Sequence, residues 1–319
     1  MSVPDINRRA VAQWLALGAV LPLVSKAQDG VTKIAFGYTT TTDYAAVYIA
    51  NEEGFFKKRN LDVELKLIAV NSTIPAAIEA GSLQLGGPTP SVYLQSVAGG
   101  LDHVVIAGGG LTSKTNTSIG LVAKAGSGIR TAQDCIGKKV GVPALGAYLH
   151  VILRAWMKQN GVDYKKVTFV EAGFQQHVDL LRGGSVDAVA TADPTLSRIT
   201  DAGIGYVVSY YPTFLPEGQP TLTFVGTRAW VEGHPAAAKA FRDAVIEGAQ
   251  FAKVPANEAA VRRHIGKYIR LPPETLAKMQ MAPLGPLVTE KQLSFWLALM
   301  RDQEMLKTEP AVSALIAKL

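Results

Sequence analysis

The sequence predicts an α/β fold with two lobes, each built on a parallel-rich sheet that carries helices on both faces. Short apolar segments with strand character alternate with helical patterns along most of the chain. A polar stretch led by glycines, residues 108–118, interrupts this alternation and indicates a crossover between lobes. Residues 80–85 are echoed by residues 183–188, and each copy ends a helix, enters a strand and precedes a small turn with proline.

Composition limits the kinds of protein that this chain can be. Of its 319 residues, 48% are hydrophobic and 18% are charged, which is typical of a folded globular protein. The net charge of +6 is scattered, with no basic run that has aromatic residues between its charges, so we expect no nucleic-acid partner. Cys135 is the only cysteine, which excludes an internal disulfide and a cysteine metal cluster.

The N-terminus has the pattern of an export signal. Arg8 and Arg9 precede an apolar run at 10–24, and small residues at 25–27 offer a cleavage site. The run is too short to span a bilayer comfortably. We therefore predict that residues 1–27 are cleaved and that the mature protein lies in the periplasm. The paired arginines suggest the twin-arginine export route, although the flanking residues match it weakly.

The first lobe is predicted to begin with three strand–helix pairs and a further strand. Apolar and alternating segments predict strands at 32–37, 63–69, 83–86 and 104–107. The helices follow residues that commonly cap helix starts, namely threonines and Asp43, then Asn71 with Pro75 in the first turn, then Thr89. These helices are expected at 45–53, 71–79 and 89–97.

The second lobe is predicted to follow the strand at 119–123. Residues 139–142 form a buried strand, and Pro143 and Gly146 end it in a tight loop. A helix begins at Ala147, with an apolar face formed by Leu149, Ile152, Leu153 and Trp156. The later elements are expected to be a strand at 167–170, a helix at 175–182, a strand at 188–191 and a helix after Pro194.

The chain then returns to the first lobe through strands at 207–211 and 221–225. From residue 235 onward the pattern is helical, with Phe241, Val245 and Ala249 on one face. We assign these helices to the first lobe and give them no chemical role. The predicted lobes are thus residues 28–116 with 213–319, and residues 117–212.

The predicted binding site lies in the loops that follow the strands. Ligands of open parallel sheets bind beyond the carboxyl ends of the strands, and here several of these loops also begin helices. The free N–H groups of a helix start favour an anion. No arginine lies in these loops. The ligand-binding residues that we predict are Tyr38, Thr41, Asp43, Tyr44, Asn71, Ser72, Thr73, Thr89, Pro90, Ser91, Thr115, Thr117, Gly146, Ala147, Tyr148, Phe174 and Asp193.

Aromatic and acidic residues leave the charge of the ligand open. Three tyrosines stand where loops meet helices, and their rings could line the pocket around the apolar part of an organic ligand: Tyr38, Tyr44 and Tyr148. Asp43 is expected to cap a helix. Asp193 could instead bind an ammonium group or a ring N–H, so a zwitterion such as an aminosulfonate, or a thiamine-type pyrimidine, remains an alternative to a simple anion.

Five segments resemble the periplasmic substrate-binding proteins of ABC importers, in the nitrate/sulfonate/taurine group that also includes thiamine-pyrimidine binders. They are residues 53–63, 80–85, 127–142, 180–188 and 232–235. The resemblance implies a type II periplasmic-binding-protein fold, in which a hinge of two crossover strands lets the lobes close on a ligand. It also implies a small-molecule ligand and delivery to a permease with a cytoplasmic ATPase. We expect a monomer.

An enzyme on the same scaffold is the main competing hypothesis. Pyrimidine-forming relatives carry a cysteine-rich motif that this chain lacks. Its five histidines show no HExxH spacing, and there is no Gly-x-Ser-x-Gly motif. We therefore predict a binding protein with no catalytic residue, cofactor or metal. The effector domain of a transcription regulator would need an N-terminal DNA-binding segment, and the export signal occupies that place.

Overall fold

The computed structural model describes residues 30–270 and 273–319. The export signal predicted for residues 1–27 lies outside the described residues. Residues Val31–Leu319 form one compact unit. No helix within the described residues has both the length and the apolar character needed to cross a membrane.

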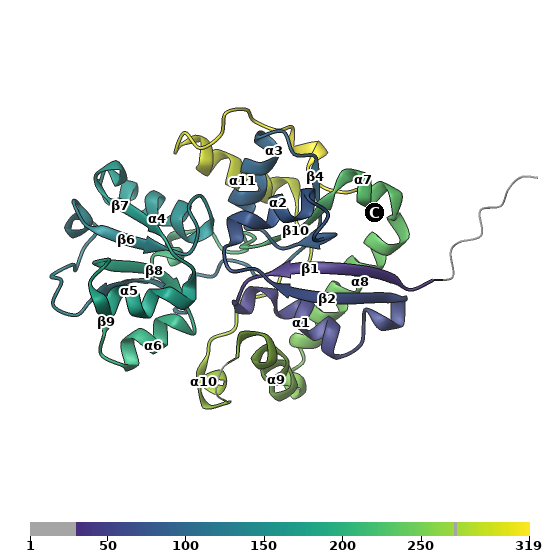
Figure 1. Ribbon diagram of the computed structural model, residues 1–319, viewed down its shortest axis with the longest axis horizontal. Helices are drawn as coiled ribbons and strands as arrows, with labels where there is room; N and C mark the ends of the chain where they lie inside the picture. The colour runs from purple at the N-terminus through teal and green to yellow at the C-terminus, as the bar shows by residue number, and fades with distance from the viewer. Residues whose placement is uncertain (1–29, 271–272) are drawn as a thin grey trace, which may run out of the picture. The chain divides into compact units, whose positions relative to one another are not determined.

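The first sheet has five strands in the order β2-β1-β3-β10-β4. Strand β1 runs parallel to β2 and β3, whereas β10 is antiparallel to β3 and β4. Helices α1 and α8 pack on one face, and α2 and α3 lie on the other (Figure 1). The strands are β1 (Thr32–Tyr38), β2 (Leu61–Leu67), β3 (Leu85–Gly86), β4 (His103–Gly108) and β10 (Thr223–Thr227). The helices are α1 (Ala45–Glu52), α2 (Ile74–Glu79), α3 (Pro90–Ala98) and α8 (Pro235–Ala252).

The second sheet has the order β7-β6-β8-β5-β9. Strand β5 shows why both faces are covered: Leu121 and Ala123 pack with α4, whereas Val122 packs with α5 and α6 on the other side. The strands are β5 (Ile119–Lys124), β6 (Lys139–Val142), β7 (Thr168–Glu171), β8 (Ala188–Ala192) and β9 (Gly205–Ser209). The helices are α4 (Tyr148–Gln159), α5 (His177–Gly183) and α6 (Thr195–Asp201).

These two sheets confirm the predicted fold class. Strand β6 is parallel to β7 and β8, and only β5 runs against its neighbours in the second sheet. Strands β2 and β9 begin two residues earlier than predicted, whereas β3 and β10 begin two residues later. Asn60 adopts a left-handed conformation (φ 55°) that turns the chain directly before Leu61.

Two segments connect the sheets and run side by side. Leu111 forms an isolated antiparallel bridge with Pro220. Next to it, the N–H of Thr112 donates to the carbonyl of Gln219 over 2.8 Å. These paired segments correspond to the two predicted crossovers. The lobe boundaries at 116/117 and 212/213 remain predictions.

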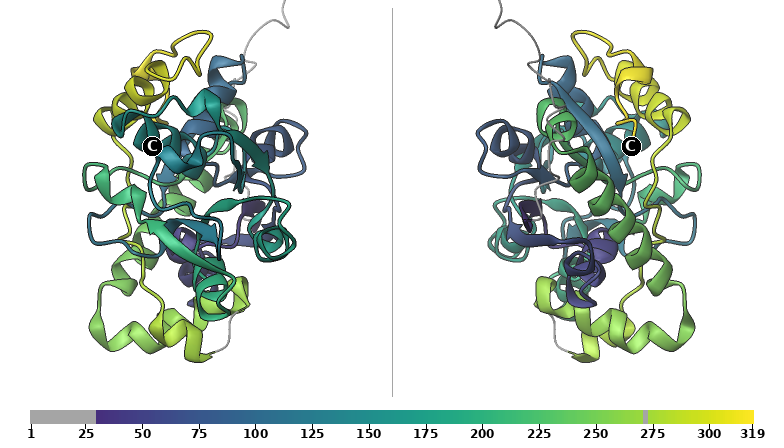
Figure 2. Two further views of the ribbon diagram at one scale, coloured as in Figure 1. Left: turned by 90° about the vertical axis from the view of Figure 1, so that its left-hand side faces the viewer. Right: turned by 90° about the vertical axis from the view of Figure 1, so that its right-hand side faces the viewer.

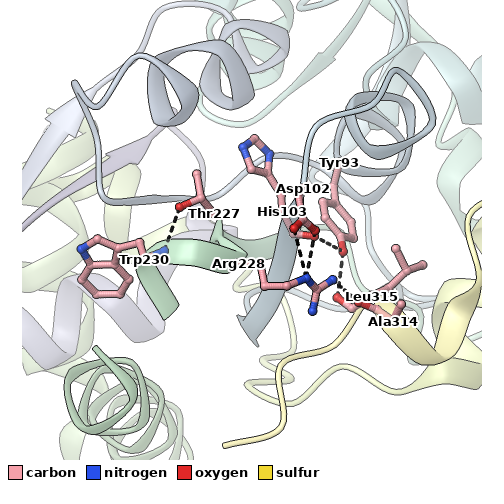
Figure 3. Close-up of polar contacts among 8 residues, drawn as sticks. All are labelled: Tyr93, Asp102, His103, Thr227, Arg228, Trp230, Ala314 and Leu315. Atoms are coloured by element: carbon pink, nitrogen blue, oxygen red, sulfur yellow. Dashed lines mark hydrogen bonds and ion pairs between the residues drawn. The ribbon is translucent and has the colours of Figure 1, made fainter. Parts of the chain in front are cut away.

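The C-terminal part of the chain is fastened to the edge of the first sheet. Figure 3 shows Arg228, which pairs with Asp102 over 2.9 Å and donates to the carbonyl of Ala314 over 2.9 Å. The Tyr93 hydroxyl donates to the carbonyl of Leu315 over 2.7 Å. The N–H of Val105 donates to that same carbonyl over 2.9 Å. The final residues therefore extend the sheet beyond β4.

The remaining helices are α7 (Arg228–Gly233), α9 (Glu258–Ile269), α10 (Pro273–Lys278) and α11 (Glu290–Arg301). Figure 2 shows α9 and α10 at the opposite end of both views from the segment that carries α11. Helix α9 packs on α1, and α11 packs on α3 of the first lobe. Just after α11, Gln303 donates to the carbonyl of Val151 in α4 over 2.9 Å, so this end of the chain contacts elements of both sheets.

Candidate functional site

A cavity of about 50 Å³ lies between the loops at the carboxyl ends of strands from both sheets. That volume would hold about three or four water molecules, or a compact head group of similar size. Its lining is made of hydroxyl, amide and apolar side chains with one carboxyl group. The lining residues are Thr39, Thr41, Asp43, Ala69, Asn71, Thr89, Ile119, Pro143, Ala144, Ala147, Tyr148, Leu149, Phe174, Ala192, Thr221 and Leu222.

The N-termini of α3 and α4 meet at this cavity. Thr89 precedes the first residue of α3 in an extended conformation, and Ala147 does the same for α4. The N–H of Tyr148 donates to Thr89 Oγ1 over 3.3 Å, which joins the two helix starts across the sheets. The first-turn N–H groups of a helix have no intrahelical acceptor, and its N-terminus carries a partial positive charge. Two such ends therefore favour negative charge here.

The loop before α4 depends on a glycine and a histidine. Gly146 has φ +76°, a left-handed conformation that favours glycine. Its N–H donates to Nδ1 of His150, one turn into α4, over 2.9 Å. From α3, Gln95 Nε2 donates to the carbonyls of Gly146 and Ser91, each over 3.0 Å. The loop is thus tied both to its own helix and to α3.

Asn71 and Trp296 position the residues that line the cavity. Asn71 Oδ1 accepts from the N–H of Thr89 over 2.8 Å, and its Nδ2 donates to the carbonyl of Gly87 over 3.1 Å. Its side chain therefore fixes the loop that begins α3. Trp296 of α11 is fully buried and packs edge-on against the Tyr148 ring, with centroids 5.6 Å apart. The C-terminal helix thus supports the aromatic wall of the cavity.

Asp43 is the only ionisable acid or base in the lining apart from the Tyr148 phenol, and no arginine, lysine or histidine belongs to this set. Its carboxyl group accepts a hydrogen bond from the Thr221 hydroxyl. Burial raises the pKa of Asp43, and the Thr221 hydroxyl opposes that shift only in part. Burial, followed by the nearby Asp43, also raises the pKa of Tyr148, which keeps this phenol a neutral donor.

The structure brings together seven of the residues predicted from the sequence. Thr41, Asp43, Asn71, Thr89, Ala147, Tyr148 and Phe174 line the cavity. Three more lie directly behind it: Pro90 and Ser91 open α3, and Gly146 shapes the loop before α4. Whether these residues contact a ligand remains a prediction.

Seven predicted residues lie elsewhere. Tyr38 and Tyr44 are buried in an aromatic cluster with Tyr48 and Phe224. Asp193 lies two residues before α6, and its Oδ1 accepts from the N–H and hydroxyl of Ser197 in the first turn over 3.0 and 2.7 Å. The other four lie outside the cavity lining: Ser72 and Thr73 beside Asn71, and Thr115 and Thr117 on the first crossover, which hydrogen-bonds to Gln280.

Nine lining residues were not predicted, although most lie next to residues that were. Thr39, Ala144 and Ala192 are in or beside loops that the sequence had singled out. Ile119, Thr221 and Leu222 lie where the two crossovers meet the sheets. A crossover must pass through the space between the lobes. The position of these three residues at the ends of the crossovers could therefore have indicated that they line the cavity. The others are Ala69, Pro143 and Leu149.

Two buried histidines near the site predict a pH-dependent stability. Burial, aided by Arg154, lowers the pKa of His150 to about 3. Burial also lowers the pKa of His177 to about 4, and its Nε2 lies 2.7 Å from the carbonyl of Ala172. Since an unfolded histidine titrates at about pH 6.5, the unfolded chain binds protons below that pH that the folded chain does not bind. The free energy of unfolding is therefore not reduced by these histidines above about pH 6.5, and it falls as the pH drops from there toward the pKa of the folded state.

We expect H177Q to reduce this dependence. Each buried histidine costs up to about 1.4 kcal/mol per pH unit below about pH 6.5, so between about pH 7 and pH 5 the variant should lose about 2 kcal/mol less stability than the natural protein. Urea unfolding at both pH values measures the difference. Asp43 and Asp193, whose pKa values are raised by burial, act in the opposite direction, but they are common to both proteins. Exposed His234 gives the control H234Q, and equal pH dependence in all three proteins would contradict the prediction.

Comparison with known proteins identifies related sequences and folds. The sequence profile of the family described as NMT1/THI5 like matches residues 41–259. A putative thiamine biosynthesis protein of Haemophilus influenzae is 31% identical over 176 residues, which is 55% of this chain and 54% of that protein. The chain thus spans about half the length of this relative. Among the described residues, no group of three or more His, Cys, Asp or Glu side chains could hold a metal ion.

Two solved structures show the same fold. The alkanesulfonate-binding protein SsuA from Xanthomonas axonopodis pv. citri, bound to MOPS, has a TM-score of 0.74 and 18% identity, and the match covers 90% of this chain and 99% of SsuA. The periplasmic nitrate-binding protein NrtA from Synechocystis PCC 6803 has a TM-score of 0.75 and 17% identity, covering 89% and 84%. At these identities the likeness establishes the periplasmic-binding-protein fold.

Proposed function

The chain belongs to the NMT1/THI5-like family, and from this premise we propose that it is the extracytoplasmic solute-binding component of an ABC importer. It captures a small organic anion, of the sulfonate or carboxylate type, in the cavity between the two sheets. It then delivers this solute to a permease driven by a cytoplasmic ATPase. The proposed location is the periplasm, which the predicted export signal supports. The observation that carries this proposal is the meeting of the α3 and α4 N-termini at the cavity.

The strength of such a site is compatible with reversible capture. Each helix N-terminus favours an anion by about 0.3–1 kcal/mol, and more when it is partly buried. Hydrogen bonds from hydroxyl and N–H groups add about 1 kcal/mol each. Several of these together approach the roughly 8 kcal/mol of micromolar binding. A site without an arginine inside it can therefore hold an anion and still release it to a permease.

The size of the cavity favours a compact head group. A volume of about 50 Å³ accommodates a carboxylate or sulfonate more readily than a whole ring system. The tail of the solute would then point toward Ala69 and Phe174 at the cavity wall. This arrangement places the charge near the helix starts and the apolar part near apolar side chains.

A thiamine-type pyrimidine is the second candidate, and Asp43 favours it. A ring N–H or an amino group would donate to a carboxylate, whereas an anion beside the same ionised carboxylate would be repelled. The name of the Haemophilus relative points the same way. Asp193 gives less support to this candidate, because its carboxylate accepts from Ser197 in the first turn of α6 and the residue lies outside the cavity lining.

A thermal-shift screen of the purified mature protein tests the proposal. The probes are ethanesulfonate, taurine, benzoate, nitrate, bicarbonate and 4-amino-5-hydroxymethyl-2-methylpyrimidine. At about 100 times Kd a ligand stabilises the folded state by about 2.7 kcal/mol, which should raise Tm by several degrees. We expect ethanesulfonate or benzoate to do so. Stabilisation by the pyrimidine alone, or recovery of a chemically altered probe by mass spectrometry, would contradict the proposal.

A further inference from the structure

A groove of about 380 Å³ adjoins the cavity between the two sheets. Ala69 and Phe174 line both spaces, so the cavity and the groove are direct neighbours that share these two residues. Much of the groove surface is apolar or aromatic, and Leu67 is 48% exposed in it. The groove is lined by Thr40, Leu67, Ile68, Ala69, Phe174, Gln175, Pro194, Thr195, Arg198, Tyr268, Ile269 and Arg270.

Two arginines are the only charged side chains in this lining. Arg198 belongs to α6 of the second sheet, and Arg270 follows the last residue of α9, which packs on the first lobe. Within the described part of the chain, neither guanidinium group makes a hydrogen bond or an ion pair. Two unpaired guanidinium groups from opposite sides of a groove form an attractive site for a carboxylate or sulfonate.

The backbone at Arg270 is an independent indication of a role. Its φ of 51° is left-handed, at the position after a helix where glycine is usual. A side chain other than glycine costs about 1 kcal/mol or more in this conformation. An arginine at this position therefore costs conformational energy that a glycine would not. Such outliers are enriched at ligand-binding positions.

We propose that this groove is a second anion subsite, and that the natural solute carries two acidic groups joined by a short apolar or aromatic spacer. This inference rests on the proposed function. One acidic group lies in the cavity at the starts of α3 and α4, the spacer passes Phe174, and the second acidic group pairs with Arg198 and Arg270. The groove thereby provides the cationic partners that the cavity lining does not contain.

The surrounding charges limit how strong the subsite can be. Asp193, Asp201 and Glu274 line a neighbouring groove on the other side of Pro194, together with Lys278. Both arginines are exposed to solvent, which screens their interaction with a ligand. We therefore expect the two arginines together to change affinity by about tenfold, as for two partly exposed charge pairs.

Matched acids that differ in one charge test the subsite by calorimetry. Terephthalate is compared with para-toluate, which has a methyl group in place of the second carboxylate, and glutarate is compared with butyrate. In the natural protein, at least one diacid should bind about tenfold more tightly than its monoacid. In R198Q/R270Q this advantage should disappear, while the monoacid affinity stays within about twofold. The control R182Q/R263Q removes two exposed arginines outside the groove and should keep the advantage.

The outcomes separate this inference from the proposed function. If both members of a pair bind equally well, or if the diacid keeps its advantage in R198Q/R270Q, the subsite is refuted and anion capture stands. If no acid of either pair binds the natural protein, the subsite is refuted as well. The thermal-shift screen then decides the proposed function separately, because ethanesulfonate, nitrate and bicarbonate need no second subsite.

Discussion

G146A should weaken the binding of benzoate by at least about tenfold, whereas G161A should leave the affinity unchanged. Both glycines flank α4 and have nearly the same left-handed backbone, with φ of +76° and +73°. A Cβ at either position costs about 1 kcal/mol in backbone strain. Of these two glycines, only Gly146 lies at the start of α4 beside the cavity, so only there does relief of the strain disturb the proposed anion site.

The neighbours of the two glycines explain the different outcomes. A Cβ at Gly146 would lie 2.8 Å from Nε2 of Gln95, whereas nothing lies within 4 Å of one at Gly161. Gln95 would have to leave the carbonyls of Ser91 and Gly146, which separates the loop from α3. Calorimetry with benzoate measures the affinity, and urea unfolding measures the shared loss of stability. Equal affinity in both variants would show that the loop before α4 does not form the site.

D43N should bind benzoate at least as tightly as the natural protein, and up to about tenfold more tightly where Asp43 is ionised. Burial raises the pKa of Asp43, so the carboxyl group is neutral below that raised pKa and negative above it. An anion in the cavity is repelled only by the negative form. The affinity of the natural protein for benzoate should therefore fall as the pH rises through this pKa, and the affinity of D43N should not.

The same variant discriminates between the two candidate ligands. A pyrimidine or amidine that donates to the Asp43 carboxylate should lose about tenfold or more in affinity when the carboxylate becomes an amide. Asparagine retains an oxygen that can accept from the Thr221 hydroxyl, which favours a folded variant. A D43N variant that keeps the unfolding midpoint of the natural protein is folded. If such a variant no longer binds benzoate, Asp43 does not repel the bound anion and this part of the proposal is wrong.

The fold was predictable because its elements carry strong local signals. Strand β6 and helix α4 were predicted closely, since Pro143 and Gly146 interrupt the chain between an apolar strand and an amphipathic helix. The paired crossovers were also anticipated. The strand ends were less certain, because a turn such as the one at Asn60 depends on a backbone conformation that the sequence does not specify.

The site was predictable to the extent that it follows the strand ends. Thr89 and Tyr148 were anticipated because both stand where a loop begins a helix. Tyr38 and Tyr44 occur at similar positions, but their rings point into the core, and spacing alone does not reveal that direction. Arg270 was missed because the C-terminal helices were assigned no chemical role, and its place in the same groove lining as Phe174 depends on tertiary packing.

The central claim is that the starts of α3 and α4 select negative charge in the cavity, and one calorimetric comparison tests it most directly. Benzoate, benzamide and benzamidinium share one carbon skeleton and differ in the charge of the head group. Our account predicts that benzoate binds the natural protein at least about tenfold more tightly than benzamide, and that benzamidinium binds most weakly. Tighter binding of benzamidinium or benzamide than of benzoate would contradict it.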